Sequence, residues 1–131
     1  MKQEDLEMLV TDLCERFPHT VYASLNDQDM RIIDISYARG GVIFTLISDT
    51  KTFLGVEGER IKPYLHPIEN MTPEDREEYE STFETIELAD GFKLTYPSER
   101  SHVFLIKKHY DTRGLIKLGL AKVAPDWMYR E

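Results

Sequence analysis

The chain of 131 residues carries a formal net charge of −8, with 41% hydrophobic and 31% charged residues, which fits one globular domain over 1–131. Aromatic residues make up 11% of the chain, a content that argues against disorder. No apolar run approaches the ~18 residues needed to span a bilayer, and the N-terminus lacks the apolar core of a signal peptide, so we expect a cytoplasmic protein with no membrane partner.

A helix is expected at the N-terminus. Apolar residues recur at steps of three and four between Leu6 and Phe17, which is typical of an amphipathic helix over 3–17, and Pro18 prevents its continuation. Cys14 lies late in this helix beside an apolar residue, and we expect it to be a small buried side chain.

The next part of the chain has the pattern of an antiparallel β-meander. Its segments rich in β-branched and aromatic residues alternate with turns rich in Asn, Asp and Gly. Strands are expected at 21–25, 30–37 and 42–47, turns at 26–29 and 38–41, and a fourth strand around 51–56. Because Ile33, Ile35 and Tyr37 alternate with polar residues, we expect them to form the buried face of the second strand.

The middle of the chain contains an interrupted strand and a clear helix start. Two prolines lie within 61–67, which predicts an edge strand or an extended arm, because each proline removes a donor from the hydrogen-bond ladder. Thr72 followed by Pro73 is a typical N-cap and first helical residue. The helix should run to about Phe83, with Tyr79 and Phe83 on its buried side and acidic residues on its other faces.

The remaining segments predict an α+β protein. A hairpin is expected from 85–88 and 92–96, which flank a turn containing Asp-Gly. Residues 98–110 are expected to form a helix, although their pattern also suits a buried strand. Asp111 is expected to cap a short helix at 112–118 that the next glycine closes. The predicted fold is therefore an N-terminal helix, an antiparallel meander of three to four strands, an acidic helix near 72–83 and a helical C-terminal region.

Two stretches resemble a known group of proteins. Residues 109–129 read HYDTRGLIKLGLAKVAPDWMY, and residues 62–72 contain the pattern KPYLxP…MT. Together they resemble a group of small uncharacterised proteins of bacterial genomes and prophages that share a D-x-R-G-L-I-x-x-G-L-A-x-x-A-P ending. That group usually has a second aromatic residue where Thr112 stands and an arginine where His66 stands. The resemblance implies a bacterial or mobile-element setting and brings with it no activity, ligand or catalytic residue.

The sequence predicts no catalytic residue, cofactor or metal. Neither a phosphate-binding glycine motif nor a G-x-S-x-G motif occurs, and a single cysteine excludes an internal disulfide. His102 and His109 are two helical turns apart and with Asp111 form a conceivable metal set. Because zinc sites on helices use one-turn spacing, we expect these histidines to hold no metal.

The charge distribution points to proteins rather than nucleic acids as partners. Residues 1–91 carry a net charge of −12 and residues 92–131 a net charge of +4. A body of this charge repels phosphates at long range, so no direct nucleic-acid binding is expected. The acidic helix is either a solvated face or a docking face for a basic partner. Three of its residues are candidates for partner binding: Glu74, Glu77 and Glu78.

Three residues near the C-terminus are further candidates for partner binding. Arg113 is expected either to pair with an acid such as Glu80 or to bind an anionic partner through its planar guanidinium group. Trp127 and Tyr129 either form an interface or belong to a tail that packs back onto the core.

The sequence therefore leaves three hypotheses for the function. The leading hypothesis is a small non-enzymatic interaction or accessory module that binds a protein partner or a second copy of itself. The first alternative is an acidic mimic of nucleic acid that inhibits a host DNA-binding enzyme. The second alternative is a metal-dependent hydrolase that uses the two histidines and Asp111.

Overall fold

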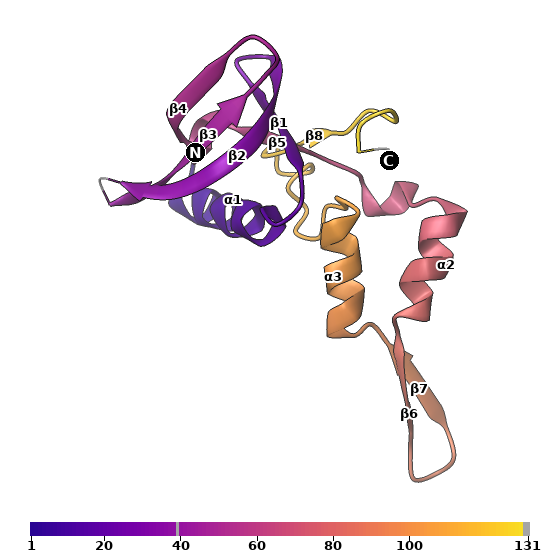
Figure 1. Ribbon diagram of the computed structural model, residues 1–131. Helices are drawn as coiled ribbons and strands as arrows, with labels where there is room; N and C mark the ends of the chain where they lie inside the picture. Colours follow the sequence, from indigo (N-terminus) through magenta and orange to yellow (C-terminus); the bar gives the residue numbers. More distant parts are fainter. Residues whose placement is uncertain (39, 130–131) are drawn as a thin grey trace.

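The structure is a computed structural model that describes residues 1–38 and 40–129, and it confirms the α+β class (Figure 1). The helices are α1 (Gln3–Arg16), α2 (Pro73–Ser81) and α3 (Glu99–Lys107), with 3₁₀ turns η1 (Gly58–Arg60) and η2 (Ile68–Asn70). The strands are β1 (Val21–Leu25), β2 (Gln28–Ala38), β3 (Gly41–Ile47), β4 (Thr52–Glu57), β5 (Lys62–Leu65), β6 (Glu84–Glu87), β7 (Lys93–Tyr96) and β8 (Lys122–Val123).

One six-stranded sheet has the order β4-β3-β2-β1-β5-β8. Its first four strands form the predicted antiparallel meander, and β5 extends it by pairing with β1. The prediction of an edge strand or an extended arm at 61–67 is wrong, since β5 pairs with β1 on one side and with β8, in parallel, on the other. Only two residue pairs join β5 to each neighbour, so Pro63 removes little of the ladder.

The burial pattern of β2 differs from the prediction. Asn26 and Asp27 both take left-handed φ angles, of 52° and 62°, so a two-residue turn joins β1 to β2 and the strand begins at Gln28. An irregularity in the pairing with β3 between Ile32 and Asp34 then changes which side chains point inwards. Met30 and Ile32 are buried. Of the predicted buried face, Ile35 is half-buried against the core, as expected, whereas Ile33 and Tyr37 are exposed. The predicted turn at 38–41 contains Arg39, which lies outside the described residues.

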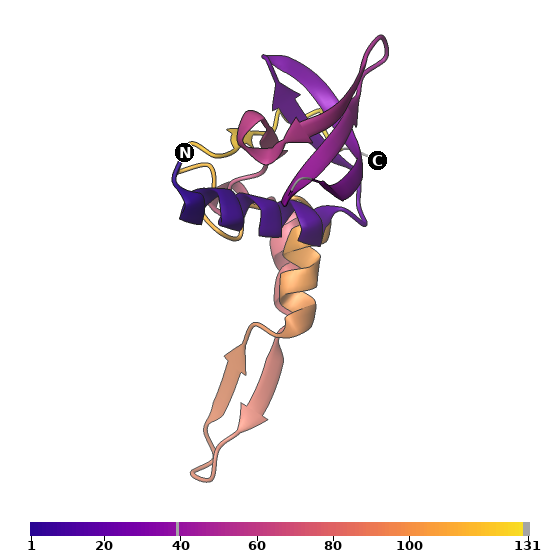
Figure 2. The same cartoon turned by 90° about the vertical axis from the view of Figure 1, so that its left-hand side faces the viewer.

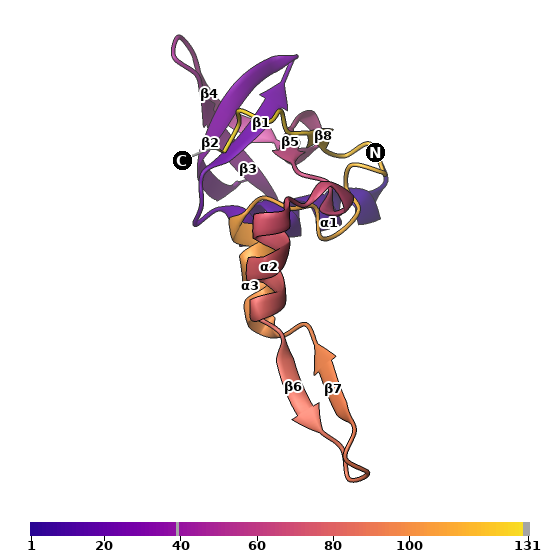
Figure 3. The same ribbon diagram turned by 90° about the vertical axis from the view of Figure 1, so that its right-hand side faces the viewer.

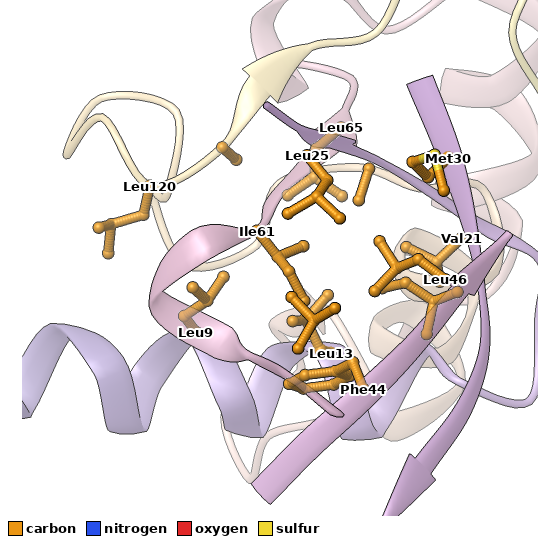
Figure 4. Close-up of a cluster of buried hydrophobic side chains, with 14 of the residues drawn as sticks. Leu9, Leu13, Val21, Leu25, Met30, Phe44, Leu46, Ile61, Leu65 and Leu120 are labelled. Atoms are coloured by element: carbon orange, nitrogen blue, oxygen red, sulfur yellow. The ribbon is translucent and has the colours of Figure 1, made fainter. Parts of the chain in front are cut away.

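The main core lies between α1 and the concave side of the sheet (Figure 4). Leu9 and Leu13 of α1 point towards side chains of the central strands, and Ile61 and Leu65 close the core from the β5 side. The predicted helical stripe is therefore confirmed as far as Leu13, whereas Phe17 follows the end of α1 and is exposed. The expected burial of Cys14 is wrong, because the stripe passes through Leu13 and leaves Cys14 exposed.

The second half of the chain forms a projecting arm, which we define as α2, β6, β7 and α3 (residues 73–107). The arm extends away from the sheet and α1, with the β6–β7 hairpin at its far end (Figure 2, Figure 3). Its two helices are joined by a small second core: Met71, Phe104, Leu105 and Tyr110, with Tyr79 packed against them. The hairpin prediction is confirmed, and the helix predicted at 98–110 is confirmed over Glu99–Lys107 and ends before His109, whose φ is left-handed. Helix α2 ends at Ser81 rather than near Phe83.

The predicted short helix at 112–118 is wrong, because this segment consists of turns. Gly114 takes a left-handed φ of 74°, which interrupts a helical path. Asp111 still accepts hydrogen bonds from the backbone N–H groups of Leu115 and Ile116, each at 2.9 Å, as a capping residue would. Gly119 has the left-handed φ, of 76°, that was expected of it.

Candidate functional site

The candidate partner-binding residues lie in three separate places. Glu74, Glu77 and Glu78 are exposed on α2 of the arm. Arg113 contacts α1, and Trp127 and Tyr129 lie in the C-terminal tail beside β1. The structure therefore does not combine them into one surface, and each place is considered by itself.

The hairpin at the end of the arm is amphipathic. Strand pairing places Ile86 opposite Leu94, and a backbone hydrogen bond of 2.7 Å from Leu88 N–H to the Phe92 carbonyl continues the ladder. Because opposed residues share a face and successive residues alternate, one face carries these four apolar side chains and the other carries Thr85, Thr95, Glu87 and Lys93. We call the first of these the hairpin face: Ile86, Leu88, Phe92 and Leu94.

All four side chains of the hairpin face are exposed. Phe92, at the tip, is 70% exposed, and nothing in the described part of the chain packs over the face. The partner-binding residues predicted from the sequence lie on the acidic helix, at Arg113 and in the C-terminal tail, and none of them belongs to this face. The signal was the alternation of apolar residues on both sides of Asp90 and Gly91, which predicts an apolar face once the hairpin is predicted.

The hairpin is held at its base by a polar network rather than by a core. Ser98 Oγ donates to the Thr82 carbonyl at 2.8 Å, and Thr82 Oγ1 bonds Ser101 Oγ at 2.6 Å. The Ser98 N–H donates to Ser101 Oγ at 2.9 Å, which starts α3 with a capping interaction. The two helices therefore meet at Thr82 and Ser98 independently of β6 and β7.

Replacing residues 84–96 by a short Gly-Ser linker should change the free energy of unfolding by less than about 1 kcal/mol. The reason is that β6 and β7 bury no side chain in either core, while Thr82 and Ser98 already lie within hydrogen-bond distance. Urea unfolding of the shortened and full chains checks this. A loss of several kcal/mol would show that the hairpin stabilises the protein itself, which would weaken its assignment as a docking element.

A buried charge network fixes α1 to the C-terminal region. Asp12 and Arg16 are both fully buried, and Arg16 Nε donates to Asp12 Oδ2 at 2.7 Å. Arg16 Nη2 also donates to the Tyr110 carbonyl at 2.6 Å. Arg113 Nη1 shares the same carboxylate, at 2.8 Å from Asp12 Oδ1. The structural pairing expected for Arg113 is therefore present, but with Asp12 and Glu15 instead of Glu80.

Glu15 forms the exposed end of this network. His102 Nε2 lies 2.7 Å from Glu15 Oε1, and Arg113 Nη2 lies 3.4 Å from Glu15 Oε2. Partial burial acts to raise the pKa of Glu15, but the hydrogen bonds from Arg113 and His102 outweigh it and hold this pKa below its ordinary value. His102, which the sequence offered with His109 and Asp111 as a metal-binding set, therefore pairs with the Glu15 carboxylate on α1.

The C-terminal tail packs back onto the sheet, one of the two outcomes that the sequence left open. The Tyr22 N–H donates to the Tyr129 hydroxyl at 2.8 Å, and this hydroxyl donates to the Tyr64 carbonyl at 2.9 Å. Met128 is buried, whereas Trp127 points outwards and is 65% exposed. Burial raises the pKa of Tyr129 well above its ordinary value, so the hydroxyl keeps its proton and its donor role.

His109 and Tyr129 form a strained, stacked pair. Both have a left-handed φ of 65°, a conformation that costs a non-glycine residue about 1 to 3 kcal/mol, and their ring centroids are 3.6 Å apart at 12°. Burial, and then the nearby Arg16, His19 and His66, lower the pKa of His109 to about 3. His109 Nδ1 is buried with no hydrogen-bond partner among the described residues. The imidazole is therefore neutral at physiological pH.

Two cavities flank this pair. The first, of about 410 Å³, is lined by His66, Asp75, Tyr110 and Asp126 among others. In it the Tyr110 hydroxyl donates to Asp75 Oδ2 at 2.6 Å, and burial together with this bond raises the pKa of Tyr110 to about 12. The second, which we call the tail cavity, has about 550 Å³ and lies between residues 18–22, the end of α3 and the C-terminal tail.

The two stretches that carry the family resemblance lie side by side around these cavities. Tyr64 pairs with Lys122, and His66 forms an isolated parallel bridge with Tyr110. Residues 62–72 and 109–129 thus build one continuous region of the molecule, and both stretches line the first cavity. The tail cavity takes residues from 109–129 but none from 62–72.

A third and larger groove lies at the other end of α1. It has about 860 Å³ and is lined by one side of α1 and by the glycine-rich ends of the β2–β3 and β4 segments. Its lining is mainly apolar, with carboxylates at Glu7, Glu57 and Glu59. Among the described residues no hydrogen bond joins these carboxylates across the groove, and Glu7 Oε1 accepts one from Gln3 Nε2 within α1, at 3.3 Å.

Residues 1–38 and 40–129 contain no helix long and apolar enough to cross a membrane. They also contain no group of three His, Cys, Asp or Glu side chains arranged to hold a metal ion. Comparison of the chain with protein-family models, with curated proteins and with solved structures gives no match.

Proposed function

We propose that this protein is a non-enzymatic interaction module that docks onto a partner protein through the hairpin face of its arm. The observation that carries the proposal is a set of four exposed apolar side chains on one face of a hairpin that projects from the body. In line with the resemblance of its sequence, we place it in a bacterial or mobile-element system.

The energetics of the hairpin favour a partner. A two-stranded hairpin alone is marginally stable in water, and an exposed apolar face adds an unfavourable contact with solvent. Contiguous exposed apolar side chains with a polar surround are typical of protein-binding surfaces. Aromatic residues such as Phe92 carry a large share of the binding energy in such interfaces.

The charge of the arm defines the class of partner. Between residues 73 and 98 there are eight carboxylates against two cations, Arg76 and Lys93, which gives a net charge of −6. A partner surface with an apolar patch surrounded by lysine and arginine complements this arrangement. Glu74, Glu77 and Glu78 then contribute steering and orientation, while the hairpin face contributes the buried area.

The hairpin face also distinguishes this proposal from acidic mimicry of nucleic acid. A mimic of the DNA backbone needs repeated negative charge along the surface that enters the enzyme's groove. Here the far end of the arm presents apolar side chains instead, and its other face pairs Glu87 with Lys93 across the strands. Protein docking therefore accounts for more of the arm than mimicry does.

A matched pair of variants tests the proposal. The double variant Ile86→Ser/Leu94→Ser removes the centre of the hairpin face, and Thr85→Ser/Thr95→Ser alters the opposite face at equivalent positions. Used as baits in lysate of the source cells, the wild type and the threonine variant should capture the same protein, and the first variant should retain about tenfold less of it. Equal capture by all three baits would contradict the proposal.

Sedimentation of the purified wild type separates a foreign partner from a second copy. A monomer at micromolar concentration is the expected result, because residues 73–98, with a net charge of −6, repel the same segment of a second copy. A dimer that the Ile86→Ser/Leu94→Ser variant abolishes would show instead that the hairpin face binds a second copy of this chain.

A further inference from the structure

The tail cavity has the composition of a binding site for a negatively charged group. The described residues that line it include the cation Lys107 and the imidazoles of His19 and His109, and none of them is acidic. His109 is neutral and Arg16 is paired with Asp12, so Lys107 supplies the formal positive charge of this lining. In a chain of net charge −8, a lining with a lysine and no carboxylate among the described residues favours an anion.

The same cavity has an aromatic side. Trp127 lines it and is largely exposed although its neighbour Met128 is buried. Tyr22 also lines it, with its ring centroid 5.4 Å from that of Tyr129. Exposed tryptophan beside other rings is a platform on which a planar group can stack.

The side of the cavity formed by Tyr129 and His109 is fixed before any ligand arrives. The Tyr129 hydroxyl is bonded to the backbone of Tyr22 and Tyr64, and its ring is stacked on His109. Such anchoring reduces the ordering that binding would otherwise require. The volume of about 550 Å³ is in the range of small-molecule sites.

We propose that the tail cavity binds a small organic anion that carries an aromatic ring, with the ring against Trp127 and the anionic group near Lys107 and His19. Nucleotides and aryl carboxylates share this chemistry. The proposal is independent of the hairpin face, because none of the four residues of that face lines the cavity, and the arm contributes to it only through Lys107 at the end of α3.

The intrinsic fluorescence of the protein tests the proposal directly, because Trp127 is the single tryptophan of the chain. The two probes are a nucleoside monophosphate and benzoate. The free nucleoside and benzyl alcohol are controls that keep the ring of each probe but lack its negative charge. Inorganic phosphate is a control that keeps the charge but lacks the ring. We expect saturable quenching or a spectral shift with at least one ring-bearing anion, and binding about tenfold weaker with its uncharged analogue and with phosphate. The probe that binds identifies the class of ligand.

Two results would overturn the proposal: no saturable change with either ring-bearing anion, or equal affinity for the charged and the uncharged ring. A lysine variant provides a second, independent test. Lys107→Gln should weaken binding by about fivefold or more, whereas Lys117→Gln, at an exposed position that does not line the cavity, should leave it unchanged. Equal affinity of the wild type and Lys107→Gln would also contradict the assignment.

The arm variant Ile86→Ser/Leu94→Ser provides the control that separates the two proposals. It should bind the anion as the wild type does, because the arm tip is remote from the tail (Figure 1). Loss of anion binding in this variant would show that the two regions are coupled and would overturn the independence stated above.

Discussion

Asp12→Asn should lower the free energy of unfolding by about 3 to 5 kcal/mol, a large part of the 5–15 kcal/mol typical of a domain. Asp12 is fully buried and accepts hydrogen bonds from both Arg16 and Arg113. Asparagine keeps the shape of the side chain but not its charge, so the fully buried guanidinium of Arg16 is left without its counter-charge. Urea unfolding followed by circular dichroism measures the change.

Glu15→Gln is the matched control for this prediction. Glu15 belongs to the same network, but its side chain is partly exposed and its oxygen lies 3.4 Å from Arg113 Nη2. A pair of this kind contributes at most about 1 kcal/mol. If the two variants lose the same stability, burial of the Asp12–Arg16 pair is not what makes the network important.

The second large effect is a pH dependence of stability that comes from His109. Its pKa is about 3 in the folded protein against 6.5 in the unfolded chain, so the unfolded chain takes up the proton first as the pH falls. The stabilisation is fully present above pH 6.5 and is lost progressively towards pH 3. Between pH 7.5 and pH 5 the loss should amount to about 2 kcal/mol, which thermal or urea unfolding at several pH values measures.

The variant His109→Asn isolates this contribution. Asparagine tolerates the left-handed conformation better than most residues and does not titrate. The variant should therefore lose about 2 kcal/mol less than the wild type over the same pH interval. His66, whose pKa burial also lowers, should leave a smaller dependence in the same direction. Coinciding pH profiles of the two proteins would show that His109 is not held neutral in the fold.

Local patterns were sufficient to predict most elements of the fold. The stripe of leucines in α1, the alternation and turns of β1 to β4, and the Thr-Pro start of α2 each depend on residues close together in the sequence. The predictions that were wrong concern features that depend on pairing with strands distant in the sequence. The position of β5 between β1 and β8, and the irregularity that shifts the alternation of buried residues along β2, follow from pairings that no single segment reveals.

Among the candidate residues too, what depends on neighbours in the sequence was predictable and what depends on distant residues was not. That Arg113 has structural acid partners was predictable from general tendencies, but Asp12 as its partner was not, because these residues are far apart in sequence. The burial of Arg16 at the polar edge of an amphipathic helix was unexpected for the same reason. The hairpin face, by contrast, was predictable from the alternation in 84–96, while the stacking of His109 on Tyr129 required the tail to be placed in space.

Photo-crosslinking in the source cells tests the docking arm most directly. A photoreactive phenylalanine analogue replaces Phe92 on the hairpin face in one strain and Thr85 on the opposite face in another. After irradiation, the first strain should give a discrete crosslinked species that contains one other protein, and the second should give much less of it. Equal crosslinking from both positions, or none from Phe92 while the protein is folded and expressed, would contradict the claim that this face binds a partner.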